Sequence, residues 1–199
     1  MGHLILTAFD IKSYLNEALP AMKAAIFRGN LSPAKDVLAI RNEALLGEWD
    51  LNDALANEDY SWLFTERSAQ VEDHDPDGLI VGLTYPLILA YHQPDLLRLP
   101  LESAELNPAL PFPADFSAGI PGLPGTEGIV QTGFQEGLRA MWEIVGYVSP
   151  EDTRTLHALC LSLAEQTPTR AAWTRDAMKL TEGVNEVLRR GYGLVVERE

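Results

Sequence analysis

SPEDTRTLHALCLSLAEQTPTRAAWTRDAMKLTEGVNEVLRRG, the sequence of residues 149–191, contains the clearest helix signals of the chain and decides its fold class. The hydroxyl of Ser149 can cap a helix, and Pro150 suits the first helical position because an N–H there would have no partner within the helix. Two carboxylates follow in the first turn, where the positive end of the helix dipole stabilises negative charge. We therefore predict a helix at 150–165.

A second helix start follows closely, because Thr167 and Pro168 repeat the same hydroxyl–proline pair. This helix has two arginines in its last turn, followed by Gly191, which can adopt the left-handed conformation of a helix cap. We place it at 168–190.

Upstream, apolar residues recur at helical spacing from a possible cap at Thr126 as far as Val145. Residues 126–190 are therefore predicted to form three consecutive helices. Shorter helical signals mark the N-terminal half of the chain. They predict a helix after Asp10 that Pro20 kinks or splits, a helix at 33–47 capped by Ser32, one or two short helices at 51–69, and a buried segment at 79–91 that could be helix or strand and for which we favour helix.

Residues 92–125 differ from the rest of the chain because they contain seven of its thirteen prolines. We expect little regular structure there, and we expect the segment to pack as a cover. One short strand is expected at 194–196, where it could pair with residues 4–6.

With 199 residues, 46% of them hydrophobic, the chain can bury one sizeable core. We predict a mainly α, compact, multi-helix single domain over residues 1–199, with at most a small terminal β-pairing. Its parts are an acidic N-terminal part (1–91), an irregular cover segment (92–125) and a helical C-terminal part (126–199).

The lone cysteine, Cys160, excludes an intrachain disulfide and is expected to be buried on an apolar helix face. Residues 1–7 contain no signal-peptide pattern, so the cytoplasm is the expected compartment. The longest apolar run, at 79–91, is 13 residues long. A membrane span needs roughly 20 residues, so no membrane association is expected.

The charge of the chain is concentrated in residues 36–77, which contain twelve carboxylates and two arginines. The whole chain has a net charge of −14, whereas residues 150–199 are nearly balanced. Such a surface repels phosphate backbones and anionic membranes. We therefore expect no nucleic-acid partner, and a basic protein as the favoured one.

Two interpretations of the acidic segment remain open. It could be a solvated face that serves only solubility, or it could bind a partner through aromatic anchors and carboxylates. The candidate partner-binding residues are Trp49, Asp50, Asp53, Glu58, Asp59, Tyr60, Asp73, Asp75 and Asp77.

Asp73, Asp75 and Asp77, followed by Gly78, resemble the first half of an EF-hand calcium loop. The twelfth position of that loop, however, is Thr84 in place of the bidentate glutamate. We expect no bound metal and no cofactor, and we interpret the segment as a solvated acidic turn.

No catalytic motif is present, and the four histidines are scattered. His92, beside Tyr91, is the one candidate base if a pocket opens there. The profile of a small acidic protein without catalytic motifs resembles that of bacterial immunity proteins in composition, but in no diagnostic residue.

Three hypotheses follow. The first is a non-catalytic inhibitor or immunity-type protein that neutralises a basic partner, such as a nucleic-acid-directed toxin or enzyme. The second is an enzyme or ligand binder whose pocket is covered by 92–125, with His92, Tyr91 or Tyr85 converging on it. The third is a helical scaffold that self-associates through its last three helices.

Overall fold

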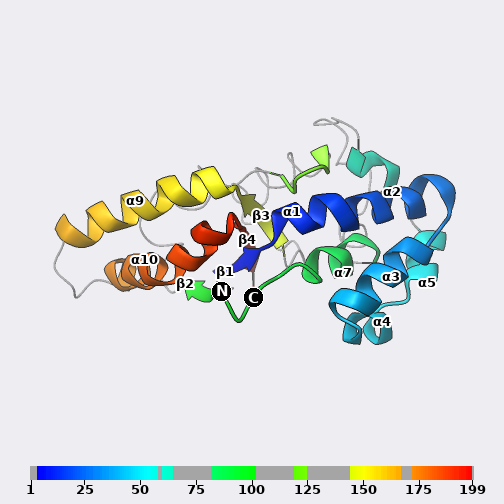
Figure 1. Cartoon of the computed structure of the whole chain (residues 1–199), viewed down its shortest axis with the longest axis horizontal. Coiled ribbons are helices and arrows are strands. Elements are labelled where there is room, and N and C mark those ends of the chain that lie inside the picture. Colours follow the sequence, from blue (N-terminus) through cyan, green and yellow to red (C-terminus); the bar gives the residue numbers. More distant parts are fainter. Residues whose placement is uncertain are drawn as a thin grey trace. The chain divides into compact units, whose positions relative to one another are not determined.

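The computed structural model describes residues 4–57, 60–64, 82–101, 119–124, 144–166 and 172–198. These residues are mainly helical, as predicted, with a small four-stranded antiparallel sheet (Figure 1). The chain divides into two compact units, one of Met1–Asp10, Gln93–Ala118 and Glu143–Glu199, the other of Ile11–His92 and Gly119–Trp142. The single domain stays a prediction, and each unit is described by itself.

The first unit is built on the sheet. Its strands are β1 (Leu4–Phe9), β2 (Arg98–Leu101), β3 (Ile144–Val148) and β4 (Gly193–Arg198), in the order β2-β1-β4-β3. Leu6 of β1 is paired with Val196 of β4 and with Leu99 of β2. The pairing predicted between residues 4–6 and 194–196 is therefore confirmed, as the centre of a larger sheet.

Two strands lie where the sequence predicted something else. β2 lies within 92–125, where little regular structure was expected. It is an edge strand, where a proline such as Pro100 can be accommodated without breaking a ladder. β3 contains Val145, which the apolar spacing had assigned to a helix. A bulge between Ile144 and Gly146 interrupts its register with β4. The predicted helix therefore does not extend to Val145, and its remaining part, at 126–143, lies outside the described residues.

Two helices follow β3. They are α9 (Pro150–Gln166) and α10 (Ala172–Arg190), which lie side by side (Figure 1). The backbone N–H of Asp152 donates to Ser149 Oγ at 3.0 Å, so the predicted cap is confirmed. Gly191 follows α10 with a φ of 70°, a conformation that residues with a Cβ rarely adopt. The predicted start of this helix at Pro168 lies outside the described residues.

The core of the first unit lies between the sheet and these helices. Cys160 is 1% exposed, as predicted, and burial raises the pKa of its thiol to about 11. The other buried apolar side chains on the strands and on α9 and α10 are Ile5, Leu6, Ala8, Phe9, Leu99, Tyr147, Val148, Leu156, Leu180, Val184, Val187, Leu194, Val195 and Val196.

The second unit begins with a long helical segment. It comprises α1 (Ile11–Ser13), the π-helical η1 (Tyr14–Ala18) and α2 (Leu19–Arg28). Proline cannot donate an N–H and its ring crowds the carbonyl four residues earlier. Directly before Pro20, the N–H of Leu19 bonds to the Tyr14 carbonyl, a π-helical step. The predicted disturbance by Pro20 is therefore present as a change of helix type.

The helix predicted at 33–47 is two helices, α3 (Ser32–Arg41) and α4 (Ala44–Glu48). They are separated at Asn42, whose backbone leaves the helical region. Ser32 is also not the cap: its backbone N–H donates to the side chain of Asn30 at 3.1 Å. The apolar spacing continues across the break, so the pattern alone did not reveal it.

The rest of the second unit consists of short elements: α5 (Leu51–Asn57), the 3₁₀ helix η2 (Tyr60–Phe64) and α7 (Thr84–Leu89). The preference for helix within 79–91 is confirmed over α7. A Cβ on Gly82 would lie 2.6 Å from that of Ala54, so glycine allows the chain before α7 to lie close to α5. In the part of the chain that the structure describes, no helix is long and apolar enough to cross a membrane.

Candidate functional site

The carboxylates of α3, α4, α5 and the turns between them are all exposed in the second unit. These residues are Asp36, Glu43, Glu48, Asp50 and Asp53. None of them is drawn into the core, because the buried positions of the same helices are small or apolar, such as Ala34, Leu38 and Leu45. The described part of the acidic segment is therefore a surface, which both interpretations of its charge require.

The neighbouring cations have partners within the unit. Lys35 Nζ donates to Asn52 Oδ1 at 3.2 Å, and Arg41 pairs with Glu17 at 2.6 Å. Both side chains are directed to acceptors on other elements, which limits how far they neutralise the carboxylates of α4 and α5.

Asp50 caps α5. The backbone N–H groups of Asn52 and Asp53 donate to its Oδ1 at 3.0 and 3.2 Å, and Asn52 Nδ2 lies 3.4 Å from the same oxygen. The bond from Asp53, then that from Asn52, lowers the pKa of this carboxyl, with a smaller contribution from Lys35. These three bonds all end on Oδ1, so Oδ2 retains its capacity to accept.

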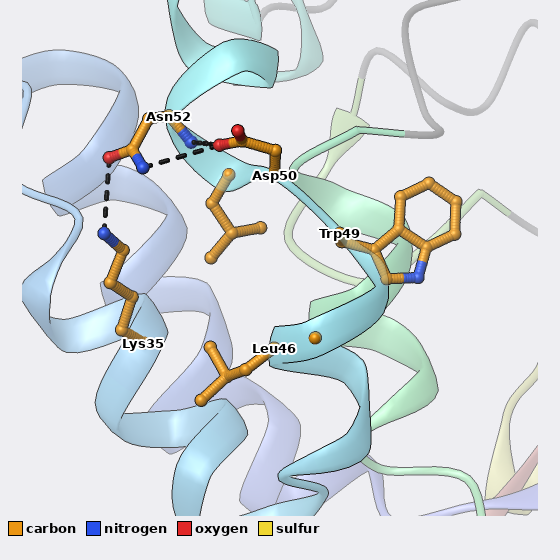
Figure 2. Close-up of a pocket in the computed structure, with 7 residues that line it drawn as sticks. Lys35, Leu46, Trp49, Asp50 and Asn52 are labelled. Atoms are coloured by element: carbon orange, nitrogen blue, oxygen red, sulfur yellow. Dashed lines mark hydrogen bonds between the residues drawn. The ribbon is translucent and has the colours of Figure 1, made fainter.

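A surface hollow of about 410 Å³ lies beside this cap (Figure 2). Lys35 and Asn52 line one part of it, with Asp50 close to Asn52, and Leu46 lines another. Leu51 also belongs to the lining but is only 2% exposed. The hollow thus combines an ammonium, an amide and a carboxylate with an apolar wall.

Trp49 contributes to the same hollow, but its ring is directed away from Lys35 and Asn52 (Figure 2). The ring packs edge-on against Tyr85 of α7, with centroids 5.6 Å apart. Trp49 is half-buried, so it fixes the turn between α4 and α5 and still leaves part of its surface accessible.

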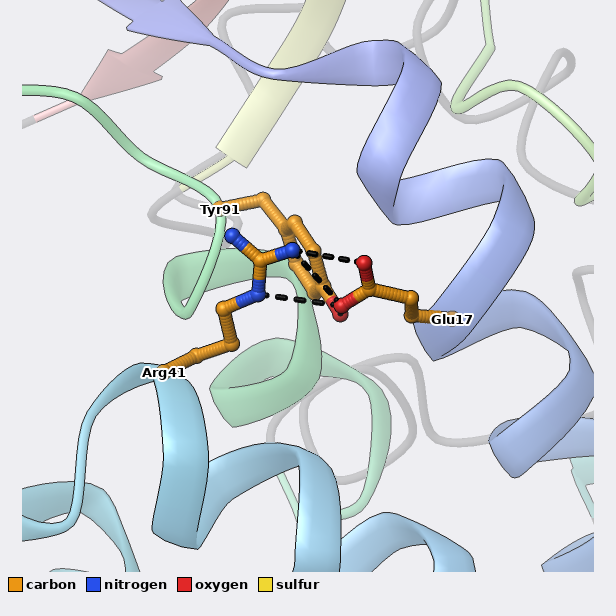
Figure 3. A network of polar contacts seen from close by, with 3 residues as sticks. All are labelled: Glu17, Arg41 and Tyr91. Carbon is orange, nitrogen blue, oxygen red and sulfur yellow. Dashed lines mark hydrogen bonds and ion pairs between the residues drawn. The ribbon is translucent and has the colours of Figure 1, made fainter.

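A second polar cluster joins three elements of this unit (Figure 3). Arg41 of α3 makes a bidentate pair with Glu17 of η1, and the Tyr91 hydroxyl donates to the same carboxylate at 3.0 Å. The guanidinium carbon lies 5.0 Å from the centre of the Tyr91 ring. Arg41 first, and the Tyr91 hydroxyl more weakly, lowers the pKa of Glu17. Because the three groups satisfy one another, we interpret the cluster as structural.

The predicted partner-binding residues have different locations. Asp50 and Asp53 are exposed and Trp49 is half-buried. Tyr60 is 1% exposed, so it belongs to the core and offers no area to a partner. Glu58, Asp59, Asp73, Asp75 and Asp77 lie outside the described residues, and so does the calcium-like loop.

The convergence of His92, Tyr91 and Tyr85 on a pocket covered by 92–125 stays a prediction, because residues 102–118 of that cover lie outside the described residues. The hydroxyl of Tyr91 is bonded to Glu17, and Tyr85 packs against Trp49. His92 is half-buried after α7 and does not line the hollow. Within the described ranges, no group of three or more histidine, cysteine or acidic side chains could hold a metal ion.

One surface residue was missed in the sequence. Ile40 is 81% exposed, the largest exposed fraction among the described large hydrophobic side chains. Ala34 and Leu38, four residues apart, define the buried face of α3, and Ile40 lies about 200° around the helix from Leu38. Asp36 is one turn before Ile40 on the same face. The buried spacing of α3 could have revealed this position.

The first unit has its own partly exposed apolar residues, Leu159 and Leu161 of α9 and Met178 of α10, at 37–41%. Self-association through this half of the chain stays a prediction. His157 of α9 has its Nε2 3.2 Å from the Thr181 carbonyl of α10.

Comparison with known proteins assigns no family. No protein-family model matches the chain, and no curated protein or solved structure matches it. The function therefore has to be argued from the site alone.

Proposed function

We propose that this chain is a non-catalytic protein-binding protein whose acidic segment, residues 36–77, holds a basic protein, as an inhibitor or immunity-type protein does. A nucleic-acid-directed toxin or enzyme is the most suitable class of partner. Such a protein must present cations to phosphates, and a carboxylate surface can occupy the same cations.

The observation that supports this proposal best is the combination of exposed carboxylates with accessible apolar area. Asp36 and Ile40 share one face of α3, and Asp50 follows Trp49 between α4 and α5. Interfaces combine apolar or aromatic anchors, which supply most of the affinity, with charges that accelerate encounter.

The test is capture of partners from the native host on the immobilised chain, at about 50 mM and about 500 mM salt, where the Debye length falls from about 14 Å to about 4 Å. We expect a basic protein that is released at the higher concentration. The double variant Asp36→Lys/Glu48→Lys should lose it, whereas Asp95→Lys/Glu182→Lys, which reverses two exposed carboxylates of the first unit, should retain it.

The variant Ile40→Ser separates the contribution of the apolar side chain of Ile40 to binding from that of the carboxylates. We expect this variant to bind the captured protein more weakly at the lower salt concentration and to unfold at nearly the wild-type temperature, since Ile40 buries little surface. Binding that is indifferent to salt, or lost equally in both double variants, would contradict the proposal.

A further inference from the structure

We infer that the hollow beside Asp50 is a receptor for one arginine side chain of the basic partner. This inference rests on the proposed function and assigns the contact that gives it specificity. The hollow combines an accessible carboxylate with an aliphatic wall, which are the two features that a guanidinium on a three-carbon stem can use at once.

The position of the carboxylate is fixed before any partner arrives. Three hydrogen bonds from Asn52 and Asp53 hold Asp50 Oδ1. The side chain is thereby oriented, and Oδ2 can accept from an incoming guanidinium without further loss of rotamer freedom. A carboxylate held in this way gives more binding per contact than a freely rotating surface carboxylate, such as one on an open helix face.

The size and the wall of the hollow suit one long side chain. A volume of about 410 Å³ is at the lower end of small-ligand sites, which extend from about 300 to 1,000 Å³. Leu46, which is half-buried, lines it and can contact the methylenes of the stem while the planar head pairs with Asp50, whereas Leu51 below is only 2% exposed. A lysine would reach the same oxygen, but its ammonium lacks the two parallel N–H groups that a guanidinium can direct to Oδ2.

Lys35 has the opposite effect on such a guest. Its ammonium lines the same hollow, is bonded to Asn52, and acts electrostatically on Asp50. A resident cation repels an incoming one, so we expect Lys35 to weaken the binding of arginine and thereby to set its affinity. Removing the charge of Asp50 should therefore weaken the binding of arginine, and removing the charge of Lys35 should strengthen it.

The experiment titrates the intact chain with N-acetyl-arginine-amide and follows the NMR signals of Leu46, Leu51 and the Asn52 side-chain amide. N-acetyl-citrulline-amide, which has the same shape without the charge, is the control probe. We expect arginine to shift these signals in a saturable way and citrulline to leave them nearly unchanged.

Three variants then divide the contributions. Asp50→Asn keeps the cap, since asparagine is as good an N-cap as aspartate, and should weaken arginine binding about threefold to fivefold, the range of an exposed ion pair. Lys35→Gln should strengthen it about twofold. Asp36→Asn removes one exposed charge on α3 outside the hollow and should change it by much less.

Equal shifts with both probes, or equal effects of Asp50→Asn and Asp36→Asn, would overturn the inference. That failure differs from failure of the proposed function. If basic proteins are captured with salt sensitivity but arginine does not enter the hollow, only the receptor site is wrong. If arginine binds and no basic protein is captured, the proposed function is wrong.

Discussion

Single residues in this chain often have a role that their type alone does not indicate. Asp50 belongs to a run of acids that the sequence suggests as a solvated face or an interface, yet its Oδ1 caps α5. Tyr60 was expected among surface aromatics and is buried. The sequence identified which residues are acidic or aromatic, but the side of a five-residue helix that faces the core depends on neighbours distant in the chain.

Glu17 allows a prediction of pH dependence. Its pKa in the folded chain is lowered from the ordinary value of 4.5 by Arg41 and Tyr91. The stabilisation is therefore complete above that ordinary value and is lost as the pH falls through the lower, folded-state pKa. Since the pair is partly exposed, Glu17→Gln should reduce the free energy of unfolding by about 0.5–1 kcal/mol at pH 7 and by almost nothing near pH 2.

Urea unfolding followed by circular dichroism at the two pH values measures this difference. Asp36→Asn, which removes an exposed carboxylate of α3, is the control and should alter stability little at either pH. A deficit of the Glu17→Gln variant that is as large in acid as at neutral pH would show that packing, not charge, is its cause.

Elements were predicted best where caps and periodicity agree. The start of α9 and the end of α10 have both signals, and both boundaries are as predicted. β3 has only an apolar spacing, which a helix and a strand can share over five residues, and pairing with β4 decides between them. β2 contains Pro100, a residue typical of loops that an edge strand also tolerates.

The cap of α9 gives a prediction at this scale. Ser149→Ala removes the acceptor for the Asp152 N–H and should lower the free energy of unfolding by about 1 kcal/mol. Ser149→Asn should restore most of it, because asparagine offers an equivalent acceptor. Chemical denaturation of the three chains measures the effect, and an asparagine variant as unstable as the alanine variant would contradict the role of the cap.

At the scale of the whole molecule, the sheet unites segments from the two ends of the sequence. β4 is paired with β1 on one side and with β3 on the other. Both ladders depend on it, whereas the Glu17–Arg41–Tyr91 cluster of the second unit does not include it. The sequence suggested only the contact between the first and last strands, because no local pattern shows which strands flank a pair.

A truncation tests this arrangement. A chain ending at Gly191 lacks β4 and leaves β1 and β3 with exposed apolar edges, so we expect it to aggregate. A chain ending at Glu197 loses one pair of the ladder with β1 and should remain monodisperse. Size-exclusion chromatography compares the two, and a monomeric shorter chain with an unchanged circular dichroism spectrum would show that β4 is dispensable.

The pairing of β1 with β4 also has a consequence for biosynthesis. Thr7 of β1 and Glu197 of β4, whose side chains are hydrogen-bonded, are 190 residues apart, a separation that takes about 10–40 s to translate at typical rates. During that time the apolar segment Leu4–Phe9 has left the ribosome while its central neighbour does not yet exist. The complete sheet can therefore form only after synthesis reaches β4, and the nascent chain carries this apolar strand without its central neighbour for most of its production.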